Sequence, residues 1–155
     1  MSGIEPLFQD LQSNALPLYY TTNKNNKKLK MNHLQNSVIQ LKNGYSAQKS
    51  TIKFINTKKS VALLKLLKSH GYIKAWFNLN PKELKIHLKY VFGVPSVKNI
   101  TSFIRPSIPI YISFQDLNKI KNSFGVLILN TAYGLITKDE ALSHKIGGHL
   151  VCLVK

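Results

Sequence analysis

Acidic residues are scarce in this chain. It contains 6 Asp and Glu against 22 Lys and Arg, which gives a formal net charge of +16, and no acid lies between Leu11 and Lys82. A charge excess of this size costs free energy through self-repulsion, so a partner that carries many phosphates is its simplest explanation. The shortage of acids therefore favours nucleic acid as the partner.

Long apolar runs are also missing. No stretch approaches the roughly 18 apolar residues of a membrane-spanning helix, and no long basic amphipathic helix suggests binding to a lipid surface. A basic membrane-surface module is therefore the less favoured alternative. Apolar residues still make up 44% of the 155 residues, which is enough for one ordinary domain or two very small ones.

Cysteine and arginine each occur once, as Cys152 and Arg105. A single cysteine rules out an internal disulfide and fits a reducing compartment. Arginine is the better bidentate ligand for phosphate, so the near-total use of lysine indicates coding bias rather than chemistry. Lys, Asn, Ile, Phe and Tyr are all abundant, as an AT-rich genome would produce.

Motifs for catalysis and metal binding are absent as well. The 5 histidines are His33, His70, His87, His144 and His149. They show neither the HExxH spacing nor a partnering CxxC, and the glycines form no phosphate-binding loop. His149 and Cys152 lie three residues apart in a predicted strand, so their side chains point to opposite faces and do not form a nucleophile–base pair. The sequence therefore predicts no enzyme, no cofactor and no metal site.

The first half of the chain shows the periodicities of an α-β-α-β-β unit. The second arm of its hairpin alternates most clearly, and its apolar residues should face Ile73, Ala75, Phe77 and Leu79. Trp76 would then lie on the polar side, covering the sheet edge or stacking on a base. The expected elements are a helix over 33–42 ended by Gly44, a strand over 51–55, a helix over 58–70 capped by Asn56 or Thr57, and a hairpin of 72–79 and 84–90.

The last thirty residues organise the rest of the chain. Residues 125–129 form an apolar run typical of a buried strand, and a polar tip over 130–134 follows. Thr137 and Glu140 have the spacing of a capping box, so a short helix should begin there and end at Gly147-Gly148. A second buried strand is expected over 150–154. The fold class is thus α+β, with two small mixed α/β lobes, the second of them rich in strands.

Changes in composition divide the chain into four parts. Residues 1–32 form an N-terminal extension and basic connector, 33–93 a first α/β lobe, 94–110 a proline-containing crossing segment, and 111–155 a second lobe. Residues 1–23 contain two acids and no Lys or Arg, which is unlike an import presequence. This agrees with local synthesis inside an organelle, and a cytosolic protein is the alternative.

The order of parts in residues 33–155 resembles the small ribosomal subunit protein eight family. Arg105-Pro106 and Tyr111 fall where that family has Ser-Arg-Pro-Gly and a tyrosine, and the residues that match in the last fifty positions are Gly125, Thr131, Gly134, Thr137, Ala141, Gly147, Gly148 and Cys152. There are departures too. Asn130 and Ala132 replace two serines, Tyr133 replaces a basic residue, and His149 replaces a glutamate.

The resemblance implies a structural constituent of the small ribosomal subunit that binds the central domain of small-subunit ribosomal RNA and supports its assembly. It also implies small-subunit proteins five and twelve as neighbours, with no small-molecule substrate. The expected location is the mitochondrion, with a plastid or the bacterial cytoplasm as alternatives. An off-ribosome nucleic-acid-binding regulator is the competing function. The expected RNA-binding residues are Lys42, Asn43, Thr57, Lys58, Arg105, Pro106, Asn130, Thr131, Ala132, Tyr133, Gly134, Gly147, Gly148 and His149.

Overall fold

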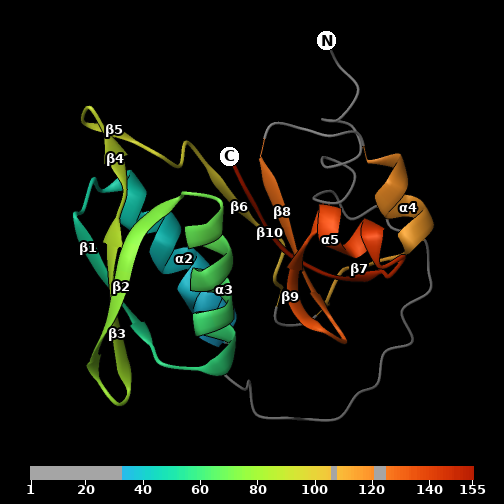
Figure 1. The fold of residues 1–155 in the computed structure, drawn as a ribbon, viewed down its shortest axis with the longest axis horizontal. Helices are drawn as coiled ribbons and strands as arrows, with labels where there is room; N and C mark the ends of the chain where they lie inside the picture. The colour runs from blue at the N-terminus through green and yellow to red at the C-terminus, as the bar shows by residue number, and fades with distance from the viewer. Residues whose placement is uncertain (1–32, 106–107, 121–124) are drawn as a thin grey trace.

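The computed structural model describes residues 33–105, 108–120 and 125–155 (Figure 1). The predicted extension over 1–32 and Pro106 lie outside these residues. The elements are α2 (His33–Ser46), β1 (Thr51–Ile55), α3 (Lys58–Ser69), β2 (Ile73–Asn80), β3 (Glu83–Leu88), β4 (Tyr90–Val91), β5 (Val94–Pro95), β6 (Ile100–Ser102), β7 (Tyr111–Ile112), α4 (Phe114–Lys119), β8 (Val126–Thr131), β9 (Gly134–Thr137), α5 (Lys138–Ser143) and β10 (Gly148–Val154). This order confirms the predicted α+β class and its opening α-β-α-β-β unit.

The elements are stacked as alternating layers of sheet and helix. The first sheet has the strand order β1-β3-β2, and the second has the order β6-β10-β8-β9, with β7 also paired to β10. Figure 1 shows α2 and α3 between the two sheets and α4 and α5 on the far side of the second sheet. One core cluster joins α2 and α3 to both sheets, and another joins α4 and α5 to the second sheet. The division into two lobes near residue 93 stays a prediction.

Strands β8 and β10 are buried on both faces. Ile128 and Val151 belong to the cluster around α2 and α3, whereas Leu127, Leu129 and Leu150 belong to the cluster around α4 and α5. A strand covered on both sides needs apolar residues at every position rather than at alternate ones. This burial explains the continuous apolar runs that marked both strands in the sequence.

Strand β2 departs from the predicted alternation. The register slips between Ile73 and Ala75, after which Trp76 lies opposite the buried Ile86 and Phe77 opposite Lys85. The prediction that Phe77 shares the apolar face is therefore wrong, and Phe77 is 59% exposed. Trp76 instead packs against the core, with the Lys68 ammonium 5.2 Å from its ring centroid. A β-bulge adds one residue and exchanges the two faces beyond it.

Two helices do not end at the glycines that were predicted to end them. Gly44 lies within α2, where an added Cβ would sit 2.7 Å from Ile52 Cγ2. Its role is close packing of the helix against β1 rather than helix termination. Helix α5 likewise ends at Ser143, before Gly147-Gly148, and His144 is its C-cap.

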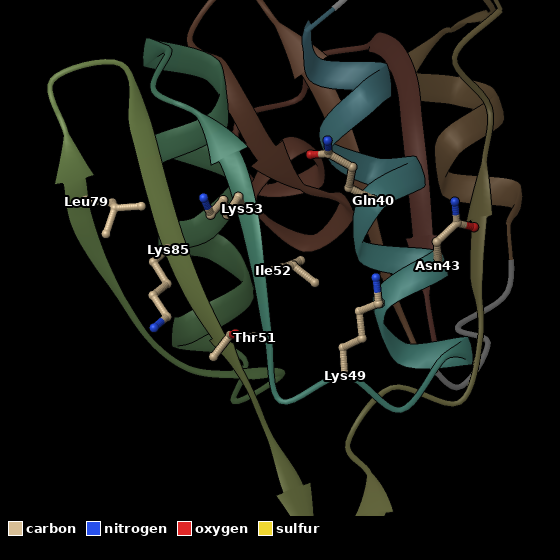
Figure 2. Close-up of a pocket in the computed structure, with 9 residues that line it drawn as sticks. Gln40, Asn43, Lys49, Thr51, Ile52, Lys53, Leu79 and Lys85 are labelled. Atoms are coloured by element: carbon tan, nitrogen blue, oxygen red, sulfur yellow. The ribbon is translucent and has the colours of Figure 1, made fainter.

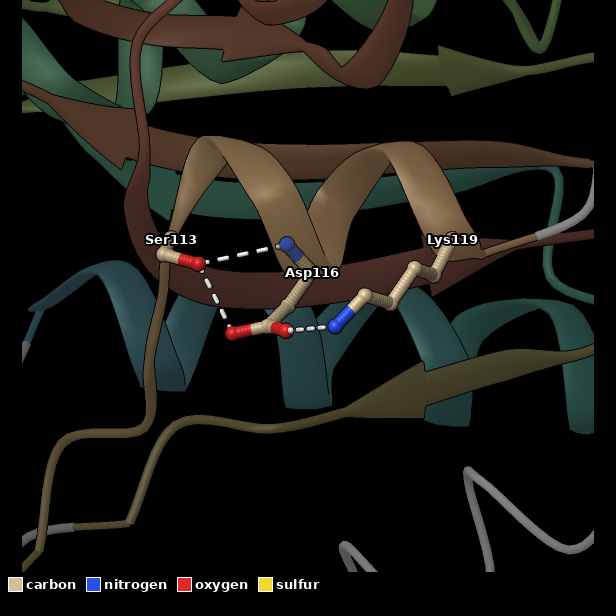
Figure 3. Close-up of polar contacts among 3 residues, drawn as sticks. All are labelled: Ser113, Asp116 and Lys119. Carbon is tan, nitrogen blue, oxygen red and sulfur yellow. Dashed lines mark hydrogen bonds and ion pairs between the residues drawn. The ribbon is translucent and has the colours of Figure 1, made fainter.

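Short helices are held by their caps. In α5, the Glu140 amide donates to Thr137 Oγ1, and the Thr137 amide donates to a Glu140 carboxylate oxygen at 3.0 Å, which confirms the predicted capping box. In α4, the Ser113 hydroxyl accepts from the Asp116 amide at 3.2 Å and donates to its carboxylate at 2.7 Å (Figure 3). The hydrogen bond from the Ser113 hydroxyl to the carboxylate, followed by the Lys119 ammonium at 3.1 Å, lowers the pKa of Asp116. Local hydrogen bonds thus start helices too short to be stable alone.

Candidate nucleic-acid interface

The predicted tip is a tight hairpin between β8 and β9. Asn130 pairs with Leu135 and Thr131 with Gly134, so only Ala132 and Tyr133 form the turn. The predicted connection of five residues is therefore a turn of two residues, because Asn130, Thr131 and Gly134 belong to the paired strands. Gly134 has φ of +105°, a backbone conformation that side chains disfavour, and nothing lies within 4 Å of where its Cβ would be. The turn requires glycine for its backbone shape and leaves open space beside it.

The Thr131 side chain holds this turn together. Its hydroxyl donates to the Gly134 carbonyl at 3.1 Å and accepts from the Tyr133 amide at 3.2 Å. A threonine hydroxyl has one proton and two lone pairs. Since the proton and one lone pair are used within the hairpin, Thr131 has one acceptor site left for a partner and acts mainly on the shape of the tip.

The Tyr133 ring is a large exposed group at the tip. It is 80% exposed, and its other side stacks on His144 with the ring centroids 6.1 Å apart and the planes 21° from parallel. His144 is the C-cap of α5. A ring that is supported on one face and open on the other presents a platform on which a base can stack.

Strand β10 brings Gly148 and His149 to this tip, and Gly147 directly precedes the strand beside β7. His149 pairs with Asn130 on one side and with Tyr111 on the other, and its ring meets the Tyr111 ring edge-on at 5.3 Å. A Cβ at Gly148 would lie 2.7 Å from Thr131 Cγ2, and one at Gly147 would overlap the Ile112 carbonyl oxygen. The paired glycines are therefore needed for strand packing beneath the tip, independently of any ligand.

The remaining predicted residues lie in three other places. Arg105 is exposed in a segment beside the first half of β10, since the Phe103 amide donates to the Val151 carbonyl and the Leu150 amide donates to the Ile110 carbonyl. Figure 1 shows the first turn of α3 at the same end of the molecule as the β8–β9 turn, and the C-terminal end of α2 at the opposite end. Thr57 and Lys58 therefore lie toward the tip, whereas Lys42 and Asn43 lie away from it.

The predicted site omits two residues that extend its surface. His144 supports Tyr133, and Tyr111 packs against His149. Tyr111 carried a signal because it coincides with a family tyrosine. His144 carried none, since its position under Tyr133 depends on where α5 ends.

The described part of the chain shows no catalytic or metal centre. Within it, no three His, Cys, Asp or Glu side chains gather as a metal site. Burial raises the pKa of the Cys152 thiol to about 12, so the thiol stays protonated and is a poor nucleophile at neutral pH. None of the helices in the described segments is long and apolar enough to cross a membrane.

Comparison with known proteins identifies the family. A family model described as ribosomal protein S8 matches residues 32–154. The chain belongs to the ribosomal protein S8 family. Small ribosomal subunit protein uS8 of Azoarcus sp. (strain BH72) is 34% identical over 119 residues, which cover 74% of this chain and 90% of the relative.

Two further relatives extend this match. The uS8 proteins of Shewanella amazonensis and Shewanella putrefaciens are 36% and 37% identical over 118 and 117 residues. Each alignment again covers 74% of this chain and 90% of the relative. The resemblance noted in the sequence is thereby confirmed, and the three relatives come from bacteria.

Proposed function

We propose that this chain is a structural, non-enzymatic constituent of the small ribosomal subunit that binds the central domain of small-subunit ribosomal RNA and supports its assembly. The observation that carries the proposal is its membership of the ribosomal protein S8 family over residues 32–154. The net charge of +16 agrees with a phosphate-rich partner.

Within this function, the β8–β9 tip is proposed as the part that recognises RNA. Tyr133 stacks on an unpaired base, His149 and Asn130 offer polar groups beside it, and Arg105 contacts phosphate. An exposed ring suits a non-duplex feature, because side chains do not reach the base edges in the deep groove of an RNA duplex. Thr57 and Lys58 add a phosphate contact at the same end of the molecule, and Lys42 and Asn43 add another at the opposite end.

Binding to a fragment of the cognate small-subunit RNA tests the function. We expect affinity to fall by roughly 10³–10⁵ between 50 and 200 mM salt if about 6–10 phosphates are contacted. A flat salt response, or sedimentation of the protein away from small subunits, would contradict the proposal and favour an off-ribosome role.

Substitutions at the tip test the proposed recognition site. Tyr133→Ala should weaken specific binding by about 1–3 kcal/mol through loss of base stacking. Thr131→Ala and Gly134→Val should also weaken it, because each disturbs the turn that presents the ring. Lys59→Ala is the control, since Lys59 is an exposed lysine of α3. Equal effects of all four substitutions would exclude the tip as the reader.

Mitochondrial location and two protein neighbours complete the proposal. The support for the mitochondrion is compositional, since Lys, Asn, Ile, Phe and Tyr are all abundant. Small-subunit proteins five and twelve are the proposed neighbours. Sedimentation of organelle lysates, followed by cross-linking of the small-subunit fraction, tests both points. Recovery of the protein outside the mitochondrial fraction would refute the location.

A further inference from the structure

The outer face of the first sheet, on the side away from α2 and α3, carries an ordered set of basic and aromatic side chains. Lys53 of β1 lies directly opposite Lys85 of β3, and Lys85 lies opposite Phe77 of β2. His87 is outward on the same strand as Lys85, and its ring meets the Phe77 ring edge-on at 5.6 Å and 83°. A row of two lysines thus ends at an aromatic ring that is 59% exposed.

This arrangement is costly in the free protein. Like charges directly opposite one another on neighbouring strands destabilise a sheet. The acid of this face is Glu83, whose carboxylate lies 3.8 Å from the Lys53 ammonium. One carboxylate against two facing lysines leaves an excess of positive charge, which an anionic ligand would neutralise.

A groove continues the face past the edge strand β1 to helix α2. It has a volume of about 720 Å³. Figure 2 shows Lys53, Lys85 and Lys49 around it, together with the Gln40 and Asn43 side chains from α2. The groove therefore combines ammonium groups with amide groups, as a site for a phosphate chain and base edges requires.

We propose that the outer face of the first sheet binds a single-stranded segment of RNA. Lys53, Lys85 and Lys49 contact successive phosphates, and the Phe77 ring stacks on one unpaired base. The inference rests on the proposed function for the choice of RNA, but it concerns a second surface, separate from the β8–β9 tip.

The chemistry of the face distinguishes single-stranded RNA from other occupants. A duplex offers phosphates to the lysines, but its stacked bases leave no open ring face for Phe77. An acidic protein segment would pair with Lys53 and Lys85 and leave Phe77 unused. Aromatic side chains combined with a basic groove are the usual means of holding unpaired nucleotides.

Fluorescence anisotropy of the full chain with a labelled oligouridylate of about 12 nucleotides tests the proposal. Phe77→Ala should weaken binding by about 5- to 150-fold, the equivalent of one lost base stack. Lys53→Gln and Lys85→Gln should each lower the slope of log affinity against log salt by about 0.7. Glu83→Gln should tighten binding, because it removes the carboxylate that competes for Lys53.

Two matched controls separate this face from general effects of charge and hydrophobicity. Lys65→Gln removes the same charge from an exposed position of α3, the helix on the other side of the sheet. Phe92→Ala removes an equally large ring from the β4–β5 turn, where Phe92 is fully exposed. Both should leave oligouridylate affinity and its salt slope unchanged. Circular dichroism and urea unfolding establish that each variant is folded.

Equal affinities of wild type, Phe77→Ala and Lys85→Gln for oligouridylate would overturn the proposal. Binding of an RNA duplex as tight as that of the single strand would also overturn it. The ribosomal RNA fragment is measured in parallel with Tyr133→Ala. If the wild type binds the ribosomal RNA fragment but the Phe77 and lysine substitutions do not change oligouridylate affinity, the second surface is refuted. If the wild type does not bind the fragment, the proposed function is refuted.

Discussion

The two larger sheets in the described part of this protein differ in how many faces they bury. The β1-β3-β2 sheet packs on α2 and α3 with one face and exposes the other, whereas β8 and β10 in the second sheet are covered on both faces. The first sheet therefore has an open surface on which polar and aromatic side chains can be substituted without disturbing the core. The second sheet has no free face at these strands, so its candidate interface is confined to the strand ends, where the β8–β9 turn emerges.

The largest expected effect compares one isoleucine from each sheet. Ile128 in β8 is fully buried, whereas Ile55 in β1 is 44% exposed on the open face. Ile128→Ala should lower the free energy of unfolding by about 2–5 kcal/mol through lost burial and a cavity, and Ile55→Ala should change it by less than about 0.5 kcal/mol. Urea denaturation measures both values. Similar losses would mean that the first sheet is covered on its outer face as well.

Two glycines sharpen the comparison of packing. A Cβ at Gly147 would meet the backbone carbonyl of Ile112, which cannot move without disturbing β7, whereas a Cβ at Gly44 would meet a side-chain methyl of Ile52. Gly147→Ala should cost about 3 kcal/mol. Gly44→Ala should cost about 1 kcal/mol, since higher helix propensity offsets part of the overlap. Thermal unfolding distinguishes them, and the reverse order would contradict this account of the β7–β10 packing.

The stability of the protein at alkaline pH compares two buried groups, Cys152 in β10 and Tyr45 in α2. Burial raises the pKa of Cys152 from 9.0 to about 12 and the pKa of Tyr45 from 10.0 to about 12. Because the folded pKa is the higher one, each group stabilises the fold below its unfolded pKa and loses that contribution as pH rises toward 12. The loss should be about 1.4 kcal/mol per pH unit, starting near pH 9 for Cys152 and near pH 10 for Tyr45.

Urea unfolding of Cys152→Ala and Tyr45→Phe from pH 8 to pH 11 checks this order. Above pH 9, the free energy of unfolding of Cys152→Ala should fall less steeply with pH than that of the wild type. For Tyr45→Phe, the difference from the wild type should begin only above pH 10. Parallel curves for wild type and Cys152→Ala would show that the thiol is not buried in solution.

The smallest expected effects concern the N-caps of α3 and α5, the helices on opposite faces of the second sheet. Thr57→Ala in α3 and Thr137→Ala in α5 should each cost about 1 kcal/mol through loss of an N-cap bond. Glu140→Ala should cost about 0.5 kcal/mol, because it removes the reciprocal bond to the Thr137 amide. Thermal melts of the three variants test this ranking. A neutral Thr137→Ala would show that packing alone holds α5 in place.

Sequence patterns predicted the elements whose cause is local. The Thr137–Glu140 spacing located the start of α5, and the alternation of β3 identified its buried face. Asn56 or Thr57 was predicted to cap α3, and the structure shows Thr57 as the N-cap. These features depend on hydrogen bonds within one turn or on which side of one strand is apolar. The structure keeps these local features because no contact with a distant part of the chain overrides them.

The candidate site was predictable in part. The segment 130–134 and residues 147–149 were named together, and the structure places Asn130 opposite His149. The division of the tip into paired strand residues and a two-residue turn was not predictable, because it depends on the register in which β8 pairs with β9. The support of Tyr133 by His144 was missed for the same kind of reason, since it requires α5 to end before Gly147.

By itself, the sequence determined the charge of this protein, the family pattern of its last strands and the caps that begin its helices. Only the tertiary structure decided which side chains of β2 face outward. The bulge after Ile73 turned Phe77 out and Trp76 in, and Gly44 lies inside α2, where it packs closely against β1. The exposure of a side chain depends on which distant segments of the chain pack against its element. A periodic sequence pattern does not show where a β-bulge inserts an extra residue or how closely a neighbouring element approaches.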